Sequence, residues 1–188
     1  NRLRAVAEDF INHYETRVAE GATVAGKAMF VCSNRKIAYN LYKKIVALRP
    51  EWAEIPGSKT ISLHQYGIAA ESIALYENTP LSLERIKLIM TRNNDDELEL
   101  YNLLGTDEER KKLDIQFKNP KSNFKIAIVV DMWITGFDVP CLDTMYIDKP
   151  LQQHTLVQTI SRVNRVYPGK DKGLVVDYIG IKNNMNTA

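Results

Sequence analysis

Short apolar runs alternate with helix-length amphipathic segments along most of this 188-residue chain, and this alternation constrains the fold more than any other feature. The short runs are too brief for typical helices, which predicts buried strands over 28–32, 86–90, 125–130, 144–147 and 174–178. Apolar residues at helical spacing predict helices over 2–19, 33–48 and 152–164, with two more inside 95–118. Strands that alternate with helices predict an α/β fold, in which a mainly parallel sheet is covered on both faces.

The chain is long enough for one well-cored domain and shows no break in composition, so we predict a single domain over 1–188. Within it we expect a leading helix and linker over 1–24, an α/β lobe over 25–180 and a polar tail over 181–188. The chain opens in a helical pattern already under way, which suggests a fragment of a larger protein. Residues 50–85 carry only weak patterns and are predicted as loop with some helix.

The composition excludes several classes of protein. Hydrophobic residues make up 45% and charged residues 26%, which is typical of a globular protein and not of a disordered or fibrous one. The formal net charge is only +2, so nucleic-acid binding would have to come from a local cluster of Lys and Arg. Cys32 and Cys141 lie far apart among apolar residues, which favours reduced thiols in a cytoplasmic protein over a disulfide. No run reaches the roughly 20 apolar residues of a membrane span, so we expect no membrane partner.

The segment from Gly21 to Lys27 has the glycine and lysine spacing of a phosphate-binding loop, but its surroundings argue against that function. Such a loop follows a strand and opens a helix, and a Ser or Thr after its lysine binds Mg²⁺. Here a predicted helix precedes, a predicted strand follows, and Ala28 stands in place of the hydroxyl. Asp131 resembles a Mg²⁺-binding acid but has no phosphate loop to act with. The sequence therefore predicts no metal site.

Three long polar side chains follow one face of the helix predicted over 152–164. Gln158, Arg162 and Arg165 are spaced by four and three residues, which brings an amide and two guanidiniums together. Arginine suits phosphate because its planar fork donates two hydrogen bonds and stays charged. The alternative is a solvated helix face whose arginines pair with nearby carboxylates.

A second polar element follows the predicted strand 125–130 directly. Gly136 allows a positive φ or the close approach of a ligand, and Asp138 is placed to accept hydrogen bonds from ribose hydroxyls. In parallel sheets, ligands bind outside the carboxyl ends of the strands, so we expect the site at that edge. The alternative is a tight turn in which Asp138 caps the local backbone.

These elements resemble known motifs of superfamily 2 helicases and translocases, in the same order along the chain. The matching segments are 31–35 for motif IV, 135–138 for motif V and 158–165 for motif VI. Longer strings further resemble the motor (R) subunit of type I restriction enzymes over most of residues 25–180, namely 131–138, 148–150 and 161–165. The resemblance implies the second lobe of a motor core, a RecA-like three-layer sandwich.

The resemblance also implies roles beside ATP for residues that match these motifs. Arg165, with Arg162 beside it, would act as an arginine finger on the γ-phosphate. Gln158 would help to position these groups or contact the nucleotide. Gly136 and Asp138 would lie near the nucleotide, Asp138 at its ribose. ATP and Mg²⁺ would be held mainly by a partner lobe, so this chain alone would not hydrolyse ATP.

On the DNA side, the resemblance places Ser33 and Arg35 at the phosphate backbone, and Thr135 either there or at the interface between the lobes. The full-length protein would be an ATP-dependent type I site-specific deoxyribonuclease that translocates double-stranded DNA. Its N-terminal RecA-like lobe and nuclease domain would be partners in the same chain. The specificity and methylation subunits of the restriction complex would be partners in other chains.

Two alternatives remain open at this point. One is another superfamily 2 motor, such as a helicase or a remodeller, which would share the fold and the arginines. The other is a non-catalytic α/β binding domain, in which the arginines pair with acids such as Asp148. A motor lobe should turn Arg162 and Arg165 into an open cleft at the carboxyl edge of the sheet. A dinucleotide-binding enzyme is disfavoured because no G-x-G-x-x-G follows any predicted strand.

Overall fold

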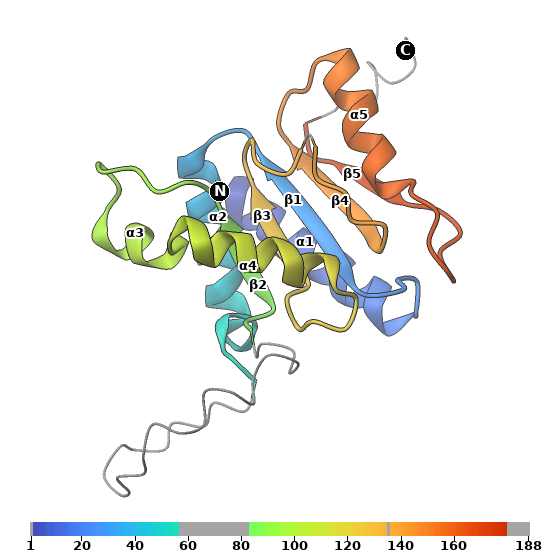
Figure 1. The fold of residues 1–188 in the computed structure, drawn as a ribbon, viewed down its shortest axis with the longest axis horizontal. Coiled ribbons are helices and arrows are strands. Elements are labelled where there is room, and N and C mark those ends of the chain that lie inside the picture. The colour runs from blue at the N-terminus through green and yellow to red at the C-terminus, as the bar shows by residue number, and fades with distance from the viewer. Residues whose placement is uncertain (1, 57–82, 135, 180–188) are drawn as a thin grey trace, which may run out of the picture.

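The computed structural model describes residues 2–56, 83–134 and 136–179, and these form a five-stranded sheet between two layers of helices (Figure 1). The strands are β1 (Lys27–Cys32), β2 (Ile86–Ile89), β3 (Ile126–Val129), β4 (Leu142–Asp148) and β5 (Leu174–Asp177). Their order is β2-β3-β1-β4-β5, and every neighbouring pair is parallel. The predicted parallel α/β fold is confirmed.

The helices lie where the apolar spacing predicts them. They are α1 (Arg2–Ala19), α2 (Arg35–Leu48), α3 (Leu98–Leu104), α4 (Asp107–Lys118) and α5 (Gln153–Val163), with a 3-10 turn η1 (Pro50–Ala53) after α2. Asn34 caps α2 by accepting a hydrogen bond from the amide of Ile37 at 2.9 Å. Thr106 and Glu109 form a reciprocal capping box that starts α4. None of the helices described here is long and apolar enough to cross a membrane.

Each strand sends alternate side chains to two separate cores, because successive residues of a strand point to opposite faces of the sheet. Phe30 of β1 and Tyr146 of β4 belong to the core beneath α1 and α2. Phe10 of α1 packs edge-on against both rings, with centroid distances of 5.4 and 4.7 Å. Met29 and Val31 face the opposite core, which α4, α5 and the segment between β3 and β4 close.

That segment spans residues 130–141, and its described residues, 130–134 and 136–141, form no helix and take the place of a crossover helix. Because β3 and β4 both run parallel to β1, β3 ends at the carboxyl edge and β4 begins at the amino edge, so the segment runs back along the sheet. The buried rings of Trp133 and Phe137 stack at 4.2 Å, and Phe117 of α4 stacks on Trp133 at 5.5 Å. Trp133 has a φ of 66°, which is rare for a bulky side chain, and this aromatic stack holds it there.

The lysine of the segment 21–27 belongs to the interior of the sheet. Lys27 is fully buried in β1 and donates hydrogen bonds to the carbonyls of Phe124 at 2.5 Å and Gln116 at 3.3 Å. Burial lowers the pKa of Lys27 to about 7, because the apolar surroundings disfavour the ammonium ion. The predicted context is confirmed, since α1 precedes this segment and β1 follows it, and this context argues against a phosphate-binding loop.

Candidate functional site

The arginine pair lies at the end of α5, the helix that packs on β4 and β5. Gln158 and Arg162 lie on this helix, as predicted. Arg165 does not, because the helix ends before Asn164, which forms the C-cap with φ −90° and ψ 14°. The chain then turns into a bridge between Tyr167 and Lys170 on its way to β5. The prediction of one helical face is therefore wrong for Arg165.

The arginines also lie away from the carboxyl edge where the sequence predicted them. β4 ends at that edge and β5 begins at the opposite edge, so α5 runs back along the sheet between them (Figure 1). Segment 130–141 runs back along the same face. The two predicted elements meet on this face, where Arg165 Nε lies 3.2 Å from Asp138 Oδ1.

The ion pair between Arg165 and Asp138 is half-exposed, with 52% and 53% of the two side chains accessible to solvent. An ion pair in this setting contributes about 0–1 kcal/mol, because water screens it. Arg165 also lines a shallow hollow of about 460 Å³ on the outer side of α5, together with Val157, Ile160 and Asn164. The guanidinium is thus held weakly beside an open surface.

Arg162 has a buried Nε with no hydrogen-bond partner among the described residues. No ion pair within the described part of the chain includes Arg162. A buried donor without an acceptor costs about 1–3 kcal/mol, and a change of rotamer that turned this nitrogen toward an acceptor would remove that cost. Asp148, the acid that a scaffold would use to neutralise the arginines, is buried and pairs with Arg2 of α1 instead. Asp148 therefore does not neutralise either arginine, while Arg165 pairs with Asp138, as the alternative of arginines paired with nearby carboxylates expects.

The other two residues predicted beside the nucleotide are accessible. Gln158 is exposed on α5, and its carbonyl accepts a hydrogen bond from Ser161 Oγ at 2.6 Å. Gly136 has a φ of 74°, one of the two possibilities that a glycine at this position allows, and a Cβ there would meet nothing within 4 Å. This open space leaves the backbone of Gly136 accessible to a ligand.

The residues predicted at DNA are placed differently from one another. Ser33 follows β1 at the carboxyl edge and is partly exposed. Arg35 donates to both carboxylate oxygens of Asp96 at 2.6 Å and to the carbonyl of Thr91 at 2.6 Å. Burial raises the pKa of Asp96, but hydrogen bonds from Arg35 and a backbone amide outweigh burial and lower it overall. Thr135 lies outside the described residues.

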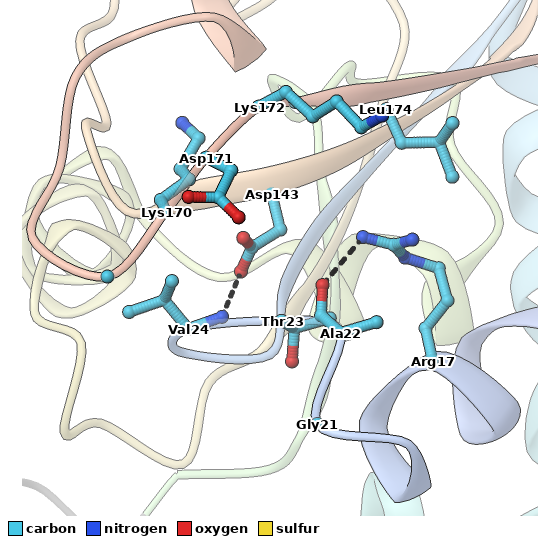
Figure 2. Close-up of a pocket in the computed structure, with 12 residues that line it drawn as sticks. Arg17, Gly21, Ala22, Thr23, Val24, Asp143, Lys170, Asp171, Lys172 and Leu174 are labelled. Atoms are coloured by element: carbon cyan, nitrogen blue, oxygen red, sulfur yellow. Dashed lines mark hydrogen bonds between the residues drawn. The ribbon is translucent and has the colours of Figure 1, made fainter.

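A separate pocket of about 420 Å³ opens at the amino edge of the sheet (Figure 2). Its charged lining comes from α1, β4 and the loop before β5, and consists of Arg17, Asp143, Lys170, Asp171 and Lys172. Asp143 accepts from the amide of Val24 at 3.1 Å, and Arg17 donates to the carbonyl of Ala22 at 2.9 Å. Sequence reasoning missed this pocket because its residues come from distant segments and form no motif.

Comparison with known proteins gives consistent matches over nearly the whole chain. A family model described as type I restriction enzyme subunit R domain 3 matches residues 24–180. The type I restriction enzyme HindI endonuclease subunit of Haemophilus influenzae is 36% identical over 190 residues, which cover 100% of this chain and 16% of that protein. The putative type I restriction enzyme MjaIXP endonuclease subunit of Methanocaldococcus jannaschii is 38% identical over 185 residues, which cover 98% and 14%. The chain thus spans at most 16% of the length of these two relatives.

Two solved structures resemble the fold at low sequence identity. A fragment of a putative HsdR subunit of a type I restriction enzyme from Vibrio vulnificus has a TM-score of 0.59 at 14% identity, covering 97% of this chain and 28% of that one. The C-terminal domain of the DEAD-box protein Dbp5 has a TM-score of 0.53 at 16% identity, covering 98% and 73%. The predicted RecA-like fold is confirmed.

Proposed function

The chain belongs to the type I restriction enzyme subunit R domain 3 family, and from this premise we propose that it is the second RecA-like lobe of an ATP-dependent DNA translocase. One observation carries the proposal: Arg162, in the last turn of α5, has an unpaired buried Nε, and Arg165, just after the helix, has a weak, half-exposed partner. Their arrangement suits an anion that another domain brings. The activity of the full-length protein is part of this proposal.

The residues present fit a triphosphate, because an unpaired guanidinium nitrogen and a second guanidinium beside an open hollow both favour phosphate oxygens. ATP supplies the phosphoanhydride bond that water cleaves. Arg162 and Arg165 stabilise the negative charge that develops at the γ-phosphate, and an arginine in this role contributes about 10³ to 10⁵ in rate. Because these groups reach the phosphate only when the two lobes close, closure of the cleft and hydrolysis are coupled.

Gly136 and Gln158 complete the proposed nucleotide side of this lobe. The Mg²⁺ that accompanies ATP belongs to the partner lobe in this proposal. In the described ranges of this chain, no group of three or more His, Cys, Asp or Glu residues is placed to hold a metal ion.

The relatives are type I restriction enzyme endonuclease subunits, which extends the proposal to a complete complex. The N-terminal RecA-like lobe and the nuclease domain of the same protein are the proposed partners within the chain. Double-stranded DNA and the specificity and methylation subunits are the proposed external partners.

The purified 188-residue chain is expected to show no ATP turnover, with or without duplex DNA, in a phosphate-release assay. The reason is that Lys27 is buried within β1 and the segment before it cannot present amides to phosphate. Arg165→Ala is the matched control, because it separates real turnover from a contaminating enzyme. ATP turnover by the isolated chain that Arg165→Ala abolishes would contradict the proposal that a partner lobe must bind the ATP.

The proposed DNA contacts are Ser33, Arg35 and Thr135, and Arg35 provides the test. In the full-length protein, Arg35→Ala is expected to weaken duplex binding and to lower the slope of binding against salt by about 1. It should also lower the free energy of unfolding by about 1–3 kcal/mol, because Asp96 is left buried without its partner.

The control for this experiment is Asp96→Asn, which breaks the same ion pair and keeps the charge of Arg35. It should lower stability while duplex binding and its salt dependence persist. Should both variants bind DNA like the wild type, the DNA assignment of Arg35 is wrong and its role is to hold Asp96.

A further inference from the structure

Asp138 is the charged partner of Arg165 within the described part of the chain, and their contact joins two elements that lie far apart in sequence. The closest approach is 3.2 Å, between Arg165 Nε and Asp138 Oδ1. Nε is the guanidinium nitrogen nearest the backbone. A contact there leaves the outer end of the guanidinium for another acceptor.

The backbone on both sides of this contact is held firmly. Phe137 and Val139 flank Asp138 and are 6% and 3% exposed, and Phe137 stacks on Trp133 at 4.2 Å. Lys118 Nζ lies 4.6 Å from the centre of the Phe137 ring, on the segment's α4 side. Asp138 is therefore a half-exposed polar side chain on backbone that buried neighbours anchor, next to Arg165.

The end of α5 is equally constrained. Val163 is buried, and Gly173 packs so closely on its carbonyl that a Cβ at Gly173 would lie 2.1 Å from that oxygen. This contact fixes the backbone two residues before Arg165. The remaining freedom of Arg165 is in its long side chain, which has many rotamers in the absence of a partner.

We propose that Asp138 is a positioning residue, which orients the guanidinium of Arg165 toward the nucleotide in place of contacting the ribose. The proposal rests on the proposed function of Arg165. A half-exposed ion pair is weak, so it selects among rotamers without holding the guanidinium against a phosphate. Arginine binds phosphate through stronger, charge-assisted and often bidentate hydrogen bonds. Asp138 thus acts on turnover through Arg165.

The test compares nucleotides in the full-length protein carrying Asp138→Asn. We expect kcat to fall by up to about fivefold, because the ion pair contributes about 0–1 kcal/mol to the orientation of Arg165, while KM for ATP stays near its original value. The factor by which kcat falls should be the same for ATP, 2′-deoxy-ATP and 3′-deoxy-ATP, because the positioning role does not involve a ribose hydroxyl. Asp138→Glu should recover much of the loss, since it restores the carboxylate. Asp107→Asn, which removes an exposed carboxylate paired with Arg110 on α4, is the matched control and should keep full turnover.

A double-mutant cycle completes the test. In the Arg165→Ala background, Asp138→Asn should cause little further loss, since the two residues act as a unit. Three results would each overturn the positioning role. The first is a loss of kcat in the Arg165→Ala background as large as in the wild-type background. The others are a loss of kcat that depends on a ribose hydroxyl and normal turnover of Asp138→Asn alone. Normal turnover of Arg165→Ala alone would overturn the proposed function itself, so the two failures are distinguishable.

Discussion

Replacement of Arg165 by alanine in the full-length protein is expected to lower kcat for ATP hydrolysis by about 10³-fold or more, while duplex DNA binding is retained. Arg162→Ala should have an effect of the same order, because its unpaired Nε is the stronger sign of a missing acceptor. Both substitutions remove charge stabilisation that is needed most in the transition state, so kcat falls more than nucleotide affinity. Steady-state phosphate release at saturating DNA, with duplex binding by fluorescence anisotropy, measures the two effects.

The control for the arginine variants is Arg4→Ala. Arg4 lies on α1, is 68% exposed and pairs with Glu8 one turn away, so its loss removes an ion-paired arginine far from α5 in sequence. Its turnover should match that of the wild type. If Arg165→Ala weakened DNA binding and turnover by the same factor, the arginines would be structural and the proposed role would be wrong.

Gly173→Ala is expected to destabilise the fold and to lower turnover together. The added Cβ would lie 2.1 Å from the carbonyl oxygen of Val163, and no side-chain rotation relieves a clash between backbone and Cβ. The end of α5 or the start of β5 must move, which costs about 1–3 kcal/mol and shifts the end of α5 that carries the arginines. Thermal unfolding should show a loss of about 2–4 °C for each kcal/mol in a domain of this size.

Gly21→Ala serves as the control for Gly173→Ala. Gly21 has a positive φ of 67° but open space around it, so the alanine introduces backbone strain without a clash. It should lower stability without changing ATP turnover in the full-length protein. A Gly173→Ala protein with wild-type stability and turnover would contradict the described packing of α5 against β5.

Local patterns were enough to predict the elements of the fold. The runs of aliphatic residues and the helical spacing depend on near neighbours, so α1 was predicted with its observed bounds. β4 is longer than predicted, since it begins at Leu142 and continues through the buried Asp143. The carboxylate of Asp143 accepts from backbone amides of the chain before β1, a contact that no local pattern reveals.

The sequence provided candidate residues for the site but not their geometry. Residue types pointed to Arg162, Arg165 and Asp138 as candidates, but not to the ion pair between Asp138 and Arg165. The site was predicted at the carboxyl edge of the sheet on the assumption that polar residues just after a strand remain at the edge where that strand ends. Segment 130–141 instead runs back along the sheet because its aromatic side chains pack there in place of a helix. The partner of Arg35 was equally hidden, because Asp96 is distant in sequence.

The most direct test of the proposed arginine role is the structure of the full-length protein with ADP and aluminium fluoride. Aluminium fluoride mimics the γ-phosphoryl group in the transition state of hydrolysis. We expect the guanidiniums of Arg162 and Arg165 to lie about 3 Å from the fluoride ligands, within hydrogen-bond distance. A closed cleft in which both arginines remain turned away from the nucleotide, while other side chains neutralise the phosphate, would contradict the proposed role of the arginines.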